Sequence, residues 1–269
     1  MSLLPALNDD RHLDPRASRL DGEAPRLTLL GGFQLWHGGA PVPVAPVGQR
    51  IVALLALSEW PLSRAQLAGQ VWLDASDDRA AASLRSALWR LPQPGGLPLV
   101  ESTVTHVALH PRVEVDYREL TAFAAEVERP GSDLTGPTAV SLSADLLPGW
   151  YEDWVFIERE RLRQLRLHAL DGLSARLTAS GRFGAAIQVA LTAVAGEPLR
   201  ESAHRALIKA HIAEGNPAEA VRQYRLCQRL LADELAVDPA PETSSLVEHL
   251  LPSAVREPNA SGIRGVMAS

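Results

Sequence analysis

The stretch that decides the fold is DDRAAASLRSALWRL, residues 77–91. Wound as an α-helix with 3.6 residues per turn, it separates its side chains onto two faces. The apolar stripe that would face a core consists of Ala80, Leu84, Ala87, Leu88 and Leu91. The opposite arc carries Arg79, Ser83, Ser86 and Arg90, with Arg85 and Trp89 on its flank. The pattern predicts an amphipathic helix whose outer face offers guanidinium groups and short hydroxyls.

Two interpretations of this outer face compete. A helical face of Arg and Ser suits the major groove of DNA, where Arg reads guanine and Ser reaches bases or phosphates. The plain alternative is the solvated face of an ordinary amphipathic helix, and the helix taken alone favours that alternative. The neighbouring segments shift the balance toward DNA.

The segments before this helix predict a helix-turn-helix. An apolar helix over 49–59 ends at Trp60-Pro61, and Ser63 can then cap a helix over 64–72 by accepting hydrogen bonds from its first N–H groups. Ser76 is the candidate cap of the helix over 77–91. Two helices joined by a short turn, the second with a polar outer face, form a helix-turn-helix. Arg64 begins the first of the two, near the expected path of the DNA backbone.

The segment after the helix predicts a wing. Strands over 99–101 and 104–109 would form a hairpin with Ser102 and Thr103 at its tip. Such a tip would lie over the DNA backbone or minor groove, with Thr103, Thr105 and His106 nearest. His106 is also explained, more plainly, as a surface histidine in a strand. Strands over 26–30, 33–37 and 42–45 predict a small antiparallel sheet; a short strand over 112–115 and a helix over 117–128 follow the hairpin.

The second half of the chain has a different pattern. Residues 155–250 are helical throughout, with breaks at Gly181, 196–198, Gly215–Pro217 and 238–241. The two glycines lie 34 residues apart, as do the pairs Leu173 and Leu207, Ala186 and Ala220, and Ile187 and Val221. This period is typical of tetratricopeptide repeats, which usually bind proteins or peptides. Helices over 182–195 and 217–231 would be the second helices of successive repeats.

Two further clusters in this region have plain interpretations. The run ERERLRQLR (158–166) places Glu158 three residues before Arg161 and Glu160 three residues before Arg163, which predicts a self-paired solvated face rather than a docking surface. Residues Trp150, Tyr151 and Trp154 are interpreted as packing residues.

Composition limits the function further. The net charge is −6, yet residues 26–120 hold eight Arg and eight Asp or Glu, so DNA affinity must come from local placement of Arg. Cys227 is alone, no apolar run has the length of a membrane span, and no signal peptide is visible, which predicts a cytoplasmic, nucleoid-associated protein. Phosphate-cradling loops, nucleophile elbows and Cys/His metal spacings are lacking, so no catalytic residue, metal or cofactor is predicted.

Longer motifs resemble a known family. LLPGWYEDWVFIERERLRQLRLHAL (146–170) resembles the opening of the bacterial transcriptional activator domain, and residues 181–243 resemble its continuation. The segments QVW (70–72), SLRSALWRL (83–91) and VEVDYREL (113–120) resemble the response-regulator-type winged helix that precedes this domain in the SARP (antibiotic regulatory protein) family. The resemblance spans about residues 26 to 250.

The resemblance implies an α+β winged helix-turn-helix domain followed by an all-α tetratricopeptide-like repeat domain. Expected boundaries are a disordered tail over 1–25, the winged helix over 26–115, the activator domain over 116–252 and a second tail over 253–269. Family members activate specialised-metabolite clusters by binding direct repeats in double-stranded DNA, as a pair of protomers, and engaging RNA polymerase holoenzyme. Helix 77–91 would then be the reader and the hairpin the wing.

This sequence departs from the family in two places. Leu91-Pro92 stops the helix where family members continue with basic residues, and Thr105-His106-Val107 replaces a Gly-Tyr-Arg-like wing segment. Both changes remove phosphate contacts and predict weak DNA binding by a monomer. The alternative function is an adaptor whose repeats bind proteins and whose winged helix no longer binds DNA.

Overall fold

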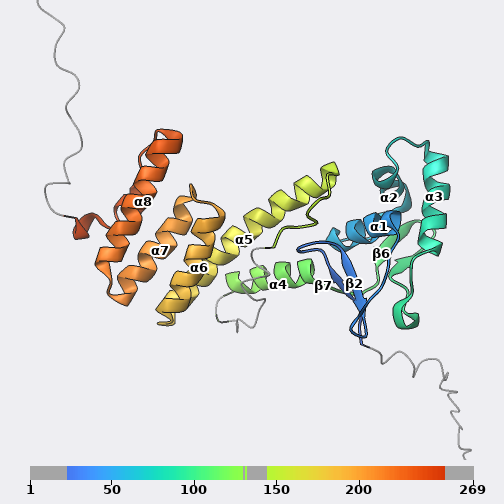
Figure 1. Cartoon of the computed structure of the whole chain (residues 1–269), viewed down its shortest axis with the longest axis horizontal. Coiled ribbons are helices and arrows are strands. Elements are labelled where there is room, and N and C mark those ends of the chain that lie inside the picture. The colour runs from blue at the N-terminus through green and yellow to red at the C-terminus, as the bar shows by residue number, and fades with distance from the viewer. Residues whose placement is uncertain (1–22, 130, 132–143, 252–269) are drawn as a thin grey trace, which may run out of the picture. The chain divides into compact units, whose positions relative to one another are not determined.

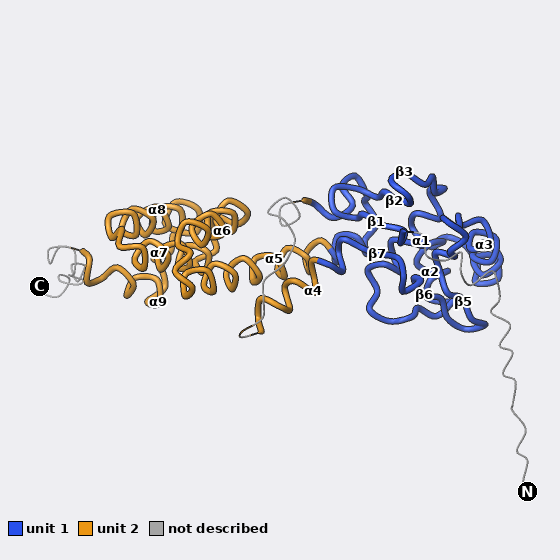
Figure 2. The backbone as a smooth tube through the Cα atoms, turned by 90° about the horizontal axis from the view of Figure 1, so that it is seen from below, with its two compact units in different colours: residues 1–119, 145–158 blue, residues 120–144, 159–269 orange. Residues whose placement is uncertain are grey.

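The computed structural model describes residues 23–129, 131 and 144–251 (Figure 1). The chain forms two compact units (Figure 2): unit 1 comprises residues 1–119 and 145–158, and unit 2 comprises residues 120–144 and 159–269. The division falls inside two helices, α4 (Asp116–Glu128) and α5 (Asp153–Ala179). Residues 145–158 therefore belong to unit 1, although sequence reasoning assigned them to the second domain. Most of the predicted tails and of the predicted loop over 130–145 lie outside the described residues.

Unit 1 opens with a four-stranded sheet in the order β3-β2-β1-β7. Its strands are β1 (Arg26–Thr28), β2 (Gln34–His37), β3 (Ala40–Pro41) and β7 (Glu114–Val115). The pair Gly38-Gly39, with φ of 56° and 73°, joins β2 to β3 in a two-residue hairpin that only residues tolerant of positive φ can form. The prediction of a third strand over 42–45 was thus placed too late. The sheet is also mixed, because β7 pairs parallel to β1.

Three helices form the centre of unit 1, namely α1 (Pro46–Leu57), α2 (Arg64–Val71) and α3 (Asp77–Trp89). Their buried faces contribute Ile51, Leu55, Leu67 and Leu84, each at most 2 % exposed. A second sheet has the order β4-β6-β5; β4 precedes α2, and a 3-10 turn at Pro94–Gly96 leads from α3 to β5 and β6. It consists of β4 (Leu62–Ser63), β5 (Val100–Ser102) and β6 (His106–Leu109). The predicted winged helix-turn-helix is confirmed.

The start of α2 confirms one predicted cap. Ser63 accepts a hydrogen bond from the N–H of Gln66 at 3.2 Å, and the Gln66 side chain accepts one from the N–H of Ser63, also at 3.2 Å. This reciprocal pair satisfies two backbone donors that the helix itself leaves unpaired. Ser76 occupies the corresponding position before α3, but its side chain makes no capping hydrogen bond, so that prediction was wrong in detail.

Two side chains at the start of α4 hold unit 1 together. Asp116 accepts hydrogen bonds from the N–H groups of Leu29 and Leu30, at 2.9 and 3.0 Å, and so joins the end of β1 to α4. Burial raises the pKa of Asp116 above its ordinary value, although these backbone hydrogen bonds act in the opposite direction. Arg118 donates from its guanidinium to the carbonyls of Leu55, Ala56 and Ser58 at 2.9–3.2 Å, at the C-terminal end of α1. These carbonyls would otherwise lack partners.

The segment Asp145–Glu158 packs on the first sheet. The N–H of Leu147 donates to the carbonyl of Leu29 at 2.8 Å. Trp150 stacks on Phe33 with ring centroids 6.3 Å apart and meets Trp154 edge-on at 6.0 Å. The packing roles of the two tryptophans are thereby confirmed, whereas Tyr151 is 79 % exposed and was wrongly interpreted as a packing residue.

Unit 2 is an array of helices: α5, α6 (Phe183–Gly196), α7 (Glu201–Glu214), α8 (Pro217–Leu235), the short α9 (Pro241–Ser244) and a 3-10 turn at Glu248–Leu250. The 34-residue period is visible in it. Gly181 and Gly215 both have positive φ, 74° and 88°, at the turns after α5 and α7. Ala186 and Ala220, one period apart, are both fully buried where paired helices approach closely. The predicted all-α repeat domain is confirmed.

Of the two pairs predicted on the polar face of α5, the structure shows that of Glu160 with Arg163, whereas Glu158 accepts a hydrogen bond from the Tyr117 hydroxyl at 3.4 Å. Arg163 donates to Glu160 at 2.9 Å, three residues earlier, and also contacts Glu197. Hydrogen bonds from Arg163, and then from Gln164, lower the pKa of Glu160 to about 2. Arg176, further along α5, donates hydrogen bonds to the carbonyls of Glu126 and Val127 at the end of α4. It caps the C-terminus of α4 in the way that Arg118 caps α1.

His204 is a fully buried polar residue on α7. Its Nε2 lies 2.8 Å from the carbonyl of Pro198, and its Nδ1 lies 2.7 Å from the amide nitrogen of Gln223. Because a carbonyl only accepts, Nε2 must carry the proton and Nδ1 must accept, which is the neutral imidazole. Burial lowers the pKa of His204 below its ordinary value.

We expect acid to destabilise unit 2 through His204. Below about pH 6.5 the imidazole becomes protonated in the unfolded chain while it stays neutral in the folded protein. The free energy of unfolding therefore falls by at most about 1.4 kcal/mol per pH unit. Urea unfolding at pH 7.5 and 5.5 measures the loss in the wild type and in His204→Gln. The variant should lack this part of the pH dependence, because glutamine has no imidazole to protonate. An identical pH dependence in the two would contradict the assignment.

Candidate nucleic-acid interface

Helix α3 presents its predicted polar arc outward in most positions. Ala80 and Leu84 are buried, and Leu91, which follows the helix, is 8 % exposed. Arg79, Arg85, Ser86 and Arg90 are exposed, whereas Ser83 is half-buried. The helix ends at Trp89 with Arg90 as its C-terminal cap residue, two residues before the predicted end. The outer arc is therefore mainly cationic.

The arginines of α3 differ from other arginines of unit 1 in their partners. In the part of the chain that the structure describes, Arg79, Arg85 and Arg90 form neither an ion pair nor a side-chain hydrogen bond. Elsewhere in unit 1, by contrast, Arg26 pairs with Glu119 at 2.8 Å and Arg50 pairs with Glu152 at 2.7 Å. Some arginines of unit 1 are thus neutralised by carboxylates, while α3 and its C-terminal cap residue keep three exposed arginines without such a partner among the described residues.

The acidic residues of α3 lie at its N-terminal end. Asp77 and Asp78 occupy its first turn, where they complement the partial positive charge of the helix N-terminus. The basic side chains at Arg85 and Arg90 lie in the second half of the helix. Arg79 stands next to these aspartates in the first half of α3.

The wing is a tight hairpin whose tip is held by hydrogen bonds within the turn. The N–H of Thr103 donates to the carbonyl of His106 at 2.9 Å, and the Thr103 hydroxyl oxygen accepts from the N–H of His106 at 3.0 Å. His106 Nδ1 lies 2.9 Å from the Thr105 hydroxyl. Ser102 belongs to β5, so the tip is Thr103–Thr105, later than predicted, and its outermost side chain is Val104, 94 % exposed. All three predicted wing residues are exposed, but their polar groups take part in the turn.

Arg64 is placed between the two parts of this surface. Its guanidinium donates to the Ser102 hydroxyl at 2.6 Å and to the carbonyl of Thr103 at 3.2 Å, and its backbone N–H donates to the carbonyl of Thr105 at 2.8 Å. Sequence reasoning placed Arg64 on the DNA backbone. The structure shows its side chain engaged with the wing, which it holds against the start of α2.

We expect Arg64→Ala to loosen the wing. Removing two side-chain hydrogen bonds, one to a hydroxyl and one to a carbonyl, should cost about 1–2 kcal/mol and raise amide hydrogen exchange at residues 102–106. Hydrogen exchange with mass spectrometry measures this directly. Arg85→Ala, which removes an exposed arginine of α3 that has no ion pair or side-chain hydrogen bond within the described residues, is the matched control and should leave the wing unchanged. Equal exchange in all three proteins would show that Arg64 does not hold the hairpin.

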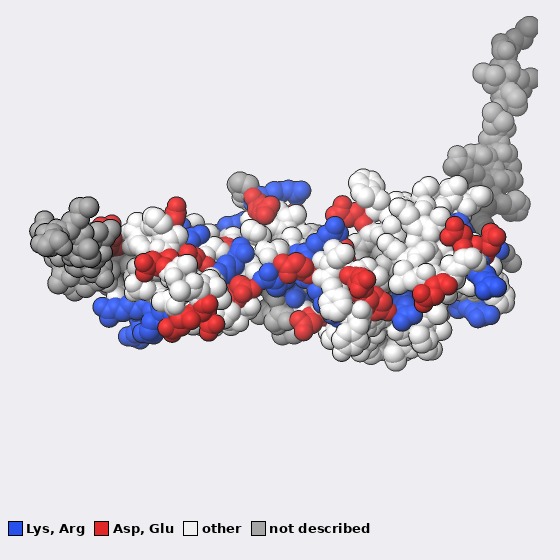
Figure 3. Space-filling view, turned by 90° about the horizontal axis from the view of Figure 1, so that it is seen from above, with Lys and Arg blue, Asp and Glu red and all other residues white. Residues whose placement is uncertain are grey.

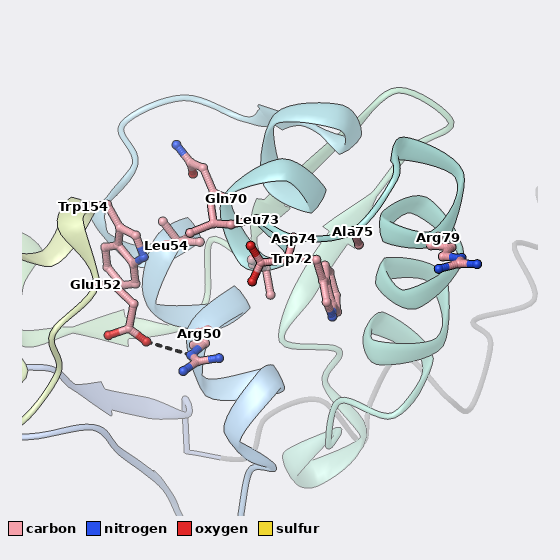
Figure 4. A pocket seen from close by; sticks show the side chains of 11 residues that line it. Arg50, Leu54, Gln70, Trp72, Leu73, Asp74, Ala75, Arg79, Glu152 and Trp154 are labelled. Atoms are coloured by element: carbon pink, nitrogen blue, oxygen red, sulfur yellow. Dashed lines mark hydrogen bonds and ion pairs between the residues drawn. The ribbon is translucent and has the colours of Figure 1, made fainter.

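A cavity of about 490 Å³ lies beside the helix-turn-helix (Figure 4). It is lined by α1, by the turn between α2 and α3, and by the segment that contains Glu152 and Trp154. Arg50 points toward Glu152 in this view, while the Arg79 side chain extends outward from α3. Within the described residues, no group of three or more His, Cys, Asp or Glu is placed to hold a metal ion. Besides the Arg50–Glu152 ion pair and two indoles, its lining includes Asp74 and Arg79.

Exposed apolar side chains are a feature that sequence periodicity did not predict for this surface. Trp89 is 87 % exposed at the end of α3, and Leu73 is 82 % exposed in the turn before it. The exposure of Trp89 could have been inferred from the sequence, because Trp89 lies on the flank of the polar arc. Nothing in the sequence distinguishes Leu73 from a core leucine.

The fold and the site together define a class of protein: a winged helix-turn-helix with an exposed cationic helix, followed by a helical repeat array. None of the described helices combines the length and the apolar character needed to cross a membrane. Comparison with known families matches residues 135–251 to the bacterial transcriptional activator domain.

Full-length relatives extend the likeness over both units. The regulatory protein AfsR of Streptomyces griseus is 28 % identical over 243 residues, covering 85 % of this chain and 25 % of that protein. AfsR of Streptomyces coelicolor is 27 % identical over 259 residues, covering 92 % of this chain and 26 % of that protein. This chain therefore spans about a quarter of the length of these relatives.

A solved structure shares the fold. EmbR of Mycobacterium tuberculosis, solved in complex with a low-affinity phosphopeptide, superimposes with a TM-score of 0.65 at 22 % identity, covering 84 % of this chain and 65 % of that one. The chain thus carries a bacterial transcriptional activator domain over its second half and is similar to the AfsR regulatory proteins over both units.

Proposed function

We propose that this protein is a DNA-binding transcriptional activator without catalytic activity. Helix α3 would enter the major groove, and the hairpin β5–β6 would lie over the backbone or minor groove. The observation that carries the proposal is the set of exposed arginines on α3, Arg79, Arg85 and Arg90, which have no carboxylate partner among the described residues. The match to the bacterial transcriptional activator domain and the similarity to AfsR support activation of transcription.

The residues would have different roles on DNA. Arg79 and Arg90 are proposed to contact bases, because an exposed guanidinium can donate two hydrogen bonds to guanine. Arg85 and the hydroxyls of Ser83 and Ser86 would contact bases or phosphates beside them. The Ser86 hydroxyl now donates to the carbonyl of Ala82 at 3.1 Å, an exposed bond that it can exchange. Thr103, Thr105 and His106 would approach the backbone, held in place by Arg64.

Partners follow from the family and remain part of the proposal. We propose that a pair of protomers binds direct repeats upstream of a promoter and engages RNA polymerase holoenzyme there, at genes for a specialised metabolite. The charge balance of residues 26–120 is zero, so each protomer should contact only about three to five phosphates. The logarithm of the binding constant should then fall against the logarithm of salt concentration with a slope of about −3 to −4.5 per protomer.

A mobility-shift titration on the DNA upstream of the protein's own gene tests the proposal. Arg79→Ala with Arg90→Ala should weaken specific binding by about 2–6 kcal/mol in total and blur two base positions in a binding selection. Arg182→Ala with Lys209→Ala removes two exposed charges from unit 2 and is the matched control. The proposal fails if the α3 variant and the wild type bind specific and random duplexes alike.

The second candidate function is a protein-interaction adaptor. The observation that favours it is the neutral charge of residues 26–120 together with wing hydroxyls that are used within the turn. An adaptor would show no difference between specific and random DNA at any salt concentration. The same titration therefore separates the two candidates.

A further inference from the structure

Helix α8 carries a row of arginines along one face. Arg222, Arg225 and Arg229 are all exposed and are spaced three and four residues apart, which places them on the same side of the helix. Figure 3 shows basic side chains gathered at the lower left, where α8 lies. Arg222 pairs with Glu219 at 2.9 Å, whereas Arg225 and Arg229 have no ion pair within the described residues.

These arginines border a groove with an apolar floor. The groove has a volume of about 650 Å³ and is formed by α8 from Pro217 to Arg229 and by Leu250 and Leu251 at the end of the last 3-10 turn. Val221, Leu250 and Leu251 contribute its apolar side chains, and all three are only partly buried against the core that contains Ile208 and Tyr224. The arginines and this floor together present positive charge beside uncovered apolar surface.

We propose that this groove is a docking site for an acidic protein segment that also carries large apolar side chains. Carboxylates of such a segment would pair with Arg225 and Arg229, and its apolar side chains would cover Val221, Leu250 and Leu251. Charge complementarity selects this occupant. A DNA backbone would meet the arginines but would leave the apolar floor uncovered, so it fits less of the site.

The chain's own C-terminal segment is a poorer match. Residues 252–269 contain two arginines and one glutamate, so their charge repels the arginine row rather than complementing it. The site does not depend on the proposed DNA binding, because it lies in unit 2 on residues that α3 and the wing do not include. The two proposals can therefore fail separately.

Fluorescence anisotropy with the full chain and no DNA tests the site. The probe is a fluorescein-labelled peptide of about twelve residues in which Asp and Glu alternate with Leu and Phe. Arg225→Gln with Arg229→Gln should weaken binding by about tenfold, and Arg182→Gln with Lys209→Gln, which removes the same charge from exposed positions elsewhere in unit 2, should not. Replacing Leu and Phe in the probe by Ser should also weaken binding about tenfold.

Charge reversal gives a test that does not rely on loss of binding. Arg225→Glu with Arg229→Glu should bind a probe in which Lys replaces Asp and Glu, which the wild type should reject. The variant with Arg79→Ala and Arg90→Ala should keep wild-type peptide binding.

Four results would overturn the proposal. The first is that the control variant loses as much peptide affinity as the Arg225 and Arg229 variant, and the second is that the Ser probe binds as tightly as the original probe. The third is that random duplex DNA is the only ligand whose binding depends on Arg225 and Arg229. The fourth is that the peptide binds only when the chain is truncated after Leu251. The last result would mean that residues 252–269 fill the groove.

Discussion

Replacing Leu84 by Ala is expected to lower the free energy of unfolding of unit 1 by about 3–5 kcal/mol. Leu84 is fully buried on the face of α3 that packs on α1 and α2. Truncation removes three carbon atoms, Cγ and the two methyl groups, and leaves a cavity between the helices. Denaturant unfolding, with hydrogen exchange in α1, α2 and α3 to report unit 1 separately, measures the effect.

The neighbouring position supplies the control for this prediction. Arg85 is exposed and has no ion pair among the described residues, so Arg85→Ala should change stability by no more than about 0.5 kcal/mol. DNA affinity is a separate matter: Arg85→Ala should weaken DNA binding, because it removes a cation from the proposed interface. If Leu84→Ala were as stable as Arg85→Ala, the assignment of inner and outer faces of α3 would be wrong.

The second large effect is expected at Arg118. Replacing it by Met keeps much of the side-chain volume but removes the donors to Leu55, Ala56 and Ser58, whose carbonyls end α1. We expect a loss of about 2–4 kcal/mol, since hydrogen bonds from a charged donor contribute more than neutral ones and the carbonyls are partly buried. Burial lowers the pKa of Arg118, which nevertheless stays protonated near neutral pH.

Arg118→Lys distinguishes charge from geometry. Lysine retains the positive charge but lacks the planar fork that reaches several carbonyls at once, so its stability should lie between that of the wild type and Arg118→Met. Thermal unfolding of the three proteins gives the order. Equal stability of the wild type and Arg118→Met would show that the end of α1 does not need this cap.

Local patterns in the sequence were sufficient for the main elements of the fold. The two faces of residues 77–91, the Ser63 cap and the 34-residue spacing of Gly181 and Gly215 each depend on interactions between residues close in the chain. Helical periodicity, capping and tight turns follow rules of short range, so they can be read from a single sequence. The motifs shared with the family predicted that a winged helix precedes the helical repeat domain.

Contacts between distant residues were decided only by the tertiary structure. The place of Arg64 at a helix start predicts a position near the DNA backbone, but only the tertiary structure shows that its guanidinium also contacts Ser102, 38 residues later. The return of residues 145–158 to unit 1, through Leu147 and Leu29, and the capping of α1 by Arg118 have no periodic signal. The sequence by itself determined which helices form and which face of α3 is polar, because those depend on neighbours along the chain. Which arginines are bound within the protein and which stay exposed for a ligand was decided by packing, because a guanidinium pairs with whatever acceptor the fold brings near it.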